Sequence, residues 1–156
     1  MATATSKVNA VVAALVAGVQ AAMLAFDTSG AVRVYEGVPM TDQPEDWLVI
    51  AQEVNQTYEA HAMVGSLGSG SLREEFQISV HIASYRGSDS PTTTTRARCA
   101  ALAGVVDDFV RNDPQIGGTC WLAFPSAHAY RSEPAGEQNQ GVETVCDMFV
   151  TCNAIP

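Results

Sequence analysis

The stretch that decides the fold is residues 76–124, which read FQISVHIASYRGSDSPTTTTRARCAALAGVVDDFVRNDPQIGGTCWLAF. Its first part alternates apolar and polar residues with a period of two, which predicts a half-buried strand. The turn-rich segment 86–91 ends this strand, and its Ser-Pro pair favours the start of a helix. Apolar residues within 99–110 follow a helical spacing, and 119–124 is apolar enough for a second strand. The stretch therefore predicts a strand, a helix and a strand, with the helix packed on one face of a sheet.

Apolar patterns predict three further strands, at 31–36, 46–51 and 142–152. The first two are expected to pair as a hairpin with a long loop, and the last to pair antiparallel with 119–124. With an N-terminal helix, this order predicts an α+β fold, a mixed β-sheet of about five strands with two helices packed on it. At 156 residues the chain is expected to form a single domain, 1–156.

Two polar segments are expected to be exposed, flexible loops, at about residues 55–70 and 126–140. The first contains Gly65-Ser66-Leu67-Gly68-Ser69-Gly70, which has the flexibility of a linker. No Gly-Lys-Ser or Gly-Lys-Thr follows it, so a phosphate-binding loop is not indicated. We expect this segment to connect a long hairpin whose second strand begins at Leu72.

Residues 7–26 have the spacing of a helix, and no charge occurs from Val8 to Phe26. Such a helix is about 30 Å long, which is also the thickness of a bilayer core. A buried core helix, a signal peptide and a membrane span therefore all have to be considered. Asn9 and Gln20 interrupt the apolar run, and alanine is only weakly apolar, so the buried helix is favoured. Its small residues either form a surface that another backbone can approach closely or only reflect the high helix propensity of alanine.

The charge of the chain argues against nucleic-acid binding. The net charge is −9, with a single lysine and arginines that do not cluster apart from Arg96 and Arg98. A stable complex with nucleic acid needs several cations on one face to neutralise phosphates. Charged residues make up 16% of the chain, below the usual ~25%. This low fraction indicates either surface hidden against other subunits or a surface rich in Ser, Thr and Gln.

The side chains best suited to catalysis or metal binding are four cysteines and three histidines: Cys99, Cys120, Cys146, Cys152, His61, His81 and His128. The cysteines form no C-x-x-C pair and lie among apolar residues, which predicts reduced core thiols in a cytosolic environment and no zinc. The histidine spacings match no metal signature, and no G-x-S-x-G sequence occurs. We therefore expect no enzyme activity, no metal and no cofactor.

Several short segments carry a resemblance to a known family: VYEGVP at 34–39, DWLVI at 46–50, EFQISV at 75–80, RAR at 96–98 and NDPQIGG at 112–118. Together with the order of the elements, they resemble the tail terminator proteins of long-tailed (siphovirus-type) bacteriophages. The likeness extends over roughly residues 7–152 and is a pattern rather than a signature motif.

The resemblance implies a structural virion protein without catalytic residues. Such a protein assembles in the host cytoplasm into a homohexameric ring at the tail–head junction. The ring caps the tail tube, ends its polymerisation and joins the tail to the head connector. Its partners would be the tail tube protein and the head–tail connector protein, DNA would pass through the lumen without specific binding, and no membrane would be involved. The alternatives are another neck or head–tail joining protein of the same assembly, or a small secreted binding domain with an N-terminal signal peptide.

For a closed ring, we expect the sheet edges and the helix at 91–111 to supply heterologous subunit contacts. The predicted loops would project toward the tube or the connector, and acidic side chains would dominate the lumen. Oppositely charged residues that can pair between subunits are Arg96, Arg98 and Arg111 on the helix, with Glu36, Glu53 and Glu59 elsewhere.

Overall fold

The computed structural model describes residues 6–39, 42–61, 71–87, 92–136 and 140–154. These residues form two helices and a five-stranded sheet, which confirms the predicted α+β fold. The elements in chain order are α1 (Val8–Phe26), β1 (Arg33–Glu36), β2 (Asp46–His61), β3 (Ser71–Gly87), α2 (Thr92–Asn112), β4 (Leu122–Ala135) and β5 (Gly141–Ala154).

The strands lie in the order β1-β2-β3-β5-β4. The predicted pairing of the last two strands is confirmed, since β4 and β5 are antiparallel. β5 is also antiparallel to β3, so β3 and β4 run parallel with β5 inserted between them. The strand–helix–strand stretch is therefore a split crossover unit.

The predicted hairpin of the first two strands is wrong, because β1 and β2 pair in parallel, with Val34 opposite Leu48. The backbone N–H of Gly37 donates to the carbonyl of Ile50 (2.8 Å), and Gly37 has a φ of 71°. The chain turns here, in a conformation that glycine adopts without strain. An alternating pattern predicts a strand but does not determine its direction, which depends on the route of the connection.

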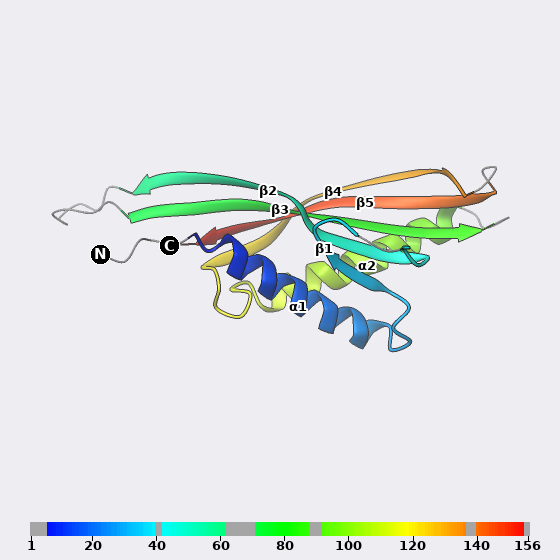
Figure 1. The fold of residues 1–156 in the computed structure, drawn as a ribbon, viewed down its shortest axis with the longest axis horizontal. Coiled ribbons are helices and arrows are strands. Elements are labelled where there is room, and N and C mark those ends of the chain that lie inside the picture. Colours follow the sequence, from blue (N-terminus) through cyan, green and yellow to red (C-terminus); the bar gives the residue numbers. More distant parts are fainter. Residues whose placement is uncertain (1–5, 40–41, 62–70, 88–91, 137–139, 155–156) are drawn as a thin grey trace.

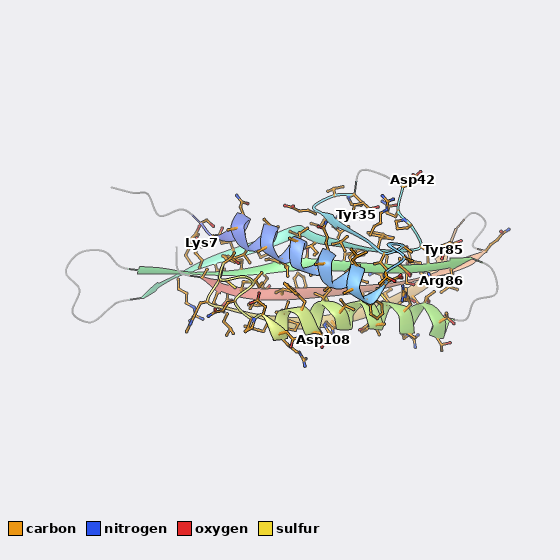
Figure 2. The ribbon with its side chains drawn as sticks, turned by 90° about the horizontal axis from the view of Figure 1, so that it is seen from below. Lys7, Tyr35, Asp42, Tyr85, Arg86 and Asp108 are labelled. Carbon is orange, nitrogen blue, oxygen red and sulfur yellow. The ribbon has the colours of Figure 1, made fainter. Side chains whose placement is uncertain are left out.

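Both helices lie on the same side of the sheet (Figure 1), and they run side by side across it when seen from that side (Figure 2). Alternate residues of β3 face the helices, and Phe76, Ile78 and Ile82 are fully buried there. The opposite face of the sheet is covered by no described helix. We call these two sides the helix-covered face and the helix-free face.

The N-terminal helix α1 is part of the core. Val11, Leu15 and Val19 are fully buried. A Cβ on Gly18 would overlap the ring of Phe109 in α2, so the missing side chain at Gly18 permits the close approach of the two helices. Among the described residues, α1 is the one helix with the length and apolarity to cross a membrane. The packing favours the core helix over that alternative.

The predicted loops at 55–70 and 126–140 are wrong for residues 55–61 and 126–135, which lie in strands, whereas the predicted long hairpin into the strand near Leu72 is confirmed. β2 continues to His61 and pairs with β3 from Ser71 onward, while β4 continues to Ala135 opposite β5. Cross-strand backbone hydrogen bonds hold these polar residues in strands, and polar composition alone does not indicate them. The paired ends of β2 and β3 extend beyond the helices at one end of the sheet (Figure 1). The remaining predicted loop residues, 62–70 and 137–139, lie outside the described part of the chain.

Candidate interaction surface

Within the described residues, no helix covers the helix-free face of the sheet. Strand register assigns its residues, because side chains alternate between the two faces. On β3 and β5 it carries the odd-numbered residues, with Ser79 opposite Phe149 and His81 opposite Asp147. On β4 it carries Leu122 and Phe124, which lie opposite Asn153 and Thr151 of β5.

One end of this face and the adjoining edge just before β4 present exposed apolar side chains. Trp121 is 61% exposed, and Leu122 and Phe124 are each 42% exposed. The guanidinium carbon of Arg73 lies 5.4 Å from the centre of the Trp121 ring, a cation–π distance. We call Trp121, Leu122, Phe124 and Arg73 the aromatic patch. Adjoining exposed apolar residues of this kind are typical of protein interaction sites.

The aromatic patch is held in place by Asn153 of β5. Its side-chain oxygen accepts hydrogen bonds from Nε (3.1 Å) and Nη2 (2.7 Å) of Arg73. Its backbone carbonyl accepts from the N–H of Trp121 (2.8 Å). Because Asn153 is only 3% exposed, these bonds fix both partners of the cation–π contact to the sheet. A preorganised surface loses little conformational entropy when it docks.

The centre of the helix-free face is polar. Nδ1 of His81 lies 2.7 Å from Oδ1 of Asp147, and the His81 ring packs 5.3 Å from the ring of Trp47. His81 and Asp147 line a cavity of ≈310 Å³ together with Ser79, Glu53 and others. Oγ of Ser79 accepts the backbone N–H of Glu53 (2.9 Å). No group of three or more metal-binding side chains occurs in the part of the chain that the structure describes. The centre therefore offers polar groups for binding.

Of the residues predicted for subunit contacts, Arg98 is engaged within its own chain. Its Nη2 donates to Asp27 after α1 (2.8 Å) and its Nε to Asp46 of β2 (2.9 Å). Asp46 also accepts from Ser84 (2.7 Å) and from Nη1 of Arg86 (2.8 Å). This cluster joins the end of α1 to α2 and the sheet, so the role of Arg98 is intramolecular.

The same contacts shift the titration of the cluster. Burial raises the pKa of Asp46, but the hydrogen bonds from Arg86, Ser84 and Arg98 outweigh burial and hold this pKa below its usual value. Hydrogen bonds from Ser29 and Arg98 likewise lower the pKa of Asp27. Both carboxylates are therefore stabilised in their charged forms.

The other five predicted contact residues are spread over three elements. Arg96 and Arg111 are exposed on α2, Glu36 is exposed at the end of β1, and Glu53 lines the cavity of the helix-free face. Glu59 lies in β2 with Arg73 as its register partner, and its side chain lies outside the described part. The structure does not bring these residues together into one site within a subunit.

The aromatic patch was not predicted from the sequence. The segment 119–124 was expected to be an apolar strand, and apolar residues are usually buried. In the structure Ala123 faces the core and is 3% exposed, while its neighbours Leu122 and Phe124 face away from the helices. The sequence did contain one indication. The segment 119–124 is apolar on both faces, but the two predicted helices are too few to cover both faces of the sheet.

A comparison with protein-family models and one with curated proteins find no match to this chain. The helix-free face and its aromatic patch are therefore the observations on which a function has to be built.

Proposed function

We propose that this chain is a structural subunit of a phage virion, the tail terminator, and that it closes into a hexameric ring at the tail–head junction. The observation that carries the proposal is the preorganised aromatic patch on a sheet face without a covering helix. Such a surface is costly to leave in water, and a neighbouring subunit would cover it. The segments that resemble tail terminators supply the expected architecture.

The distribution of charge suits a head-to-tail ring. The exposed arginines Arg96 and Arg111 lie on α2, on the helix-covered side. The carboxylates of Glu53 and Asp147 line the cavity on the opposite face. In a ring, Arg96 and Arg111 of one subunit would meet Glu53 and Asp147 of the next through two different surfaces, while Arg73 adds one cation to the helix-free face. Heterologous contacts of this kind generate closed rings, and opposite charges fix their register.

The overall charge suits passage of DNA through the ring. A net charge of −9 repels the phosphate backbone, so DNA would slide through the lumen without being bound. In this proposal the partners are the tail tube protein on one side and the head–tail connector protein on the other. No membrane takes part.

Another neck or head–tail joining protein would use the same surfaces, so the position in the particle has to be measured. A small secreted binding domain with a signal peptide is less compatible with the packing. Cleavage after α1 would remove Val11, Leu15 and Val19 from the core.

The proposal can be tested by imaging the virion and by native mass spectrometry of the chain with its tail tube protein. We expect six-fold density at the tail–head junction and a hexamer on the tube end. Phe124→Asp should abolish the ring and give tubes of uncontrolled length, because the charge would lie in the subunit contact. Leu24→Asp is the matched control, since Leu24 is 58% exposed on α1, away from the helix-free face. Density away from the junction, or a ring that tolerates Phe124→Asp, would refute the proposal.

A further inference from the structure

Strand β2 contains a bulge beside the cavity of the helix-free face. The register of β2 against β3 shifts between Ile50 and Val54. As a result, residues 51–53 lie opposite Ser79 alone. The backbone N–H of Glu53 donates to Oγ of Ser79 (2.9 Å), so a side chain of β3 satisfies a donor that the interrupted strand pairing leaves. Bulges re-aim side chains, and they occur preferentially at sheet edges and beside functional sites.

The bulge contains a strained residue. Ala51 has a φ of 60°, in the left-handed region that glycine adopts freely and that alanine adopts at a cost. Of the described residues other than glycine, only Ala51 and Ile116 have a positive φ, and Ile116 lies in the turn before β4 rather than in a strand. Strain of this kind persists where the surrounding structure imposes it, and it is concentrated at functional sites.

The bulge forms one wall of the ≈310 Å³ cavity, because Glu53 lines it across from Asp147. One oxygen of each carboxylate is engaged within the chain. Oε1 of Glu53 accepts from Asn55 (3.0 Å), and Oδ1 of Asp147 lies 2.7 Å from Nδ1 of His81. Since a water molecule occupies about 30 Å³, the cavity has room for the end of one long side chain. Two carboxylates at one small hollow suit a guanidinium, whose planar fork of donors can bond to both.

Few cations of a second copy could enter this cavity. Two arginines are bound to Asp46 of their own chain: Arg86 and Arg98. Three more lie by register on the helix-free face itself, and so would not oppose the cavity if a second copy packed its helix-covered side there: Arg33, Arg73 and Arg131. The remaining cations are exposed on or beside the helices: Lys7, Arg96 and Arg111. Of these, only the two arginines of α2 carry the fork that can bridge two carboxylates.

We propose that the bulge and its cavity form a receptor for an exposed arginine of α2, Arg96 or Arg111, from a second copy of this chain. Glu53 and Asp147 bind the guanidinium, and Ser79 is a positioning residue that holds Glu53 at the cavity. The inference deepens the proposed function and rests on it, because the second copy is the neighbouring subunit of the ring. It assigns the register of the subunit contact to the bulge, since apolar contacts alone are not directional.

The first test follows the hexamer by native mass spectrometry of the full chain with its tail tube protein. Glu53→Arg should reduce the hexamer at least about tenfold, because like charges would meet in the contact. Glu45→Arg is the matched control, since it makes the same charge change at a residue that is 68% exposed and outside the cavity. Adding Arg96→Glu or Arg111→Glu to Glu53→Arg should restore hexamers by exchanging the charges. Failure of both combinations would overturn the inference.

The role of the bulge is tested at Ser79 and Ala51. Ser79→Ala should weaken assembly while the urea midpoint of the dilute monomer stays close to that of the wild type. Ser79→Thr keeps a hydroxyl acceptor for the Glu53 N–H and should retain assembly. Ala51→Gly should keep the hexamer without lowering the Tm, because glycine adopts the positive φ without strain. A Ser79→Ala variant that assembles like the wild type would overturn the positioning role.

A titration of the dilute monomer separates the receptor from the ring. N-acetyl-arginine amide should shift the backbone amide NMR signals of Glu53, Ser79 and Asp147, whereas its neutral analogue N-acetyl-citrulline amide should not. Absence of an arginine-specific shift would overturn the inference. Hexamers that tolerate Glu53→Arg would also overturn it, and they would leave the proposed function standing. Particles without six-fold density at the junction would refute the proposed function, and with it the second copy as the source of the arginine.

Discussion

The two faces of the sheet carry apolar side chains for different reasons. On the helix-covered face, Phe76, Ile78 and Ile82 lie beneath the two helices and are fully buried. On the helix-free face, Leu122 and Phe124 are equally apolar, but each remains 42% exposed. The first set stabilises the monomer through burial, and in our proposal the second set is covered by a neighbouring subunit. Substitutions on the two faces should therefore affect different measurements.

The largest effect on stability is expected at the helix-covered face. Leu15→Asp would place an unpaired charge where the wild-type side chain is fully buried. The unfolding free energy should fall by more than about 4 kcal/mol, leaving no soluble folded protein. Circular dichroism and soluble yield measure this. Ala17→Asp, on the exposed side of the same helix, is the control and should remain folded. A folded Leu15→Asp variant would show that α1 is not part of the core.

The second-largest effect on stability is expected at the charged cluster that connects the end of α1 to α2 and the sheet. Asp46→Asn should lower the unfolding free energy by about 2–3 kcal/mol at pH 7, since two arginines lose their shared carboxylate. Urea denaturation measures this loss. Glu45→Gln is the matched control, because its carboxylate is 68% exposed and 3.6 Å from Arg86, and it should change stability by less than about 0.5 kcal/mol.

The Asp46 effect should also depend on pH. Its folded-state pKa is below the usual value of 3.8, so the stabilisation is fully present above that value. The stabilisation is lost as the pH falls through the folded-state pKa. The difference between wild type and Asp46→Asn should therefore shrink when urea titrations are repeated below pH 3.8. A constant difference would mean that Asp46 stabilises the fold through packing rather than charge.

A smaller effect is expected where α1 and α2 touch. Gly18→Ala should destabilise the fold by about 1–2 kcal/mol, because the new methyl group overlaps the ring of Phe109 and outweighs the gain in helix propensity. Gly104→Ala in α2 is the matched control, since nothing lies within 4 Å of its added Cβ. That change should stabilise the fold by roughly 0.5–1 kcal/mol. Thermal unfolding of both variants measures whether each substitution raises or lowers stability. Changes in the same direction would contradict the proposed packing.

The smallest effect on monomer stability is expected at the helix-free face. Phe124→Asp should lower the unfolding free energy by about 1 kcal/mol, far less than Leu15→Asp, because Phe124 is already 42% exposed to water. Urea denaturation below the concentration of assembly measures this. A loss as large as that of Leu15→Asp would mean that the helix-free face belongs to the monomer core, and the distinction between the two faces would fail.

The parts of the fold that could be predicted are those determined by the periodicity of neighbouring residues in the sequence. The alternation in β3 and the helical spacing in α1 and α2 predicted which side chains are buried, because those periods follow from backbone geometry. The far parts of β2 and β4 were predicted as loops, because their strand pairing is set by partners that are distant in sequence. The candidate surface was missed for a related reason, since exposure of Trp121 depends on where the helices pack.

By itself, the sequence determined the elements, their inward faces, the free state of the buried cysteines and a charge that disfavours nucleic acid. Only the tertiary structure decided the parallel pairing of β1 with β2 and the intramolecular engagement of Arg98. It also decided that none of the described helices covers one face of the sheet. Local periodicity follows from φ and ψ preferences, whereas each of these outcomes depends on which distant segments meet and on the path between them.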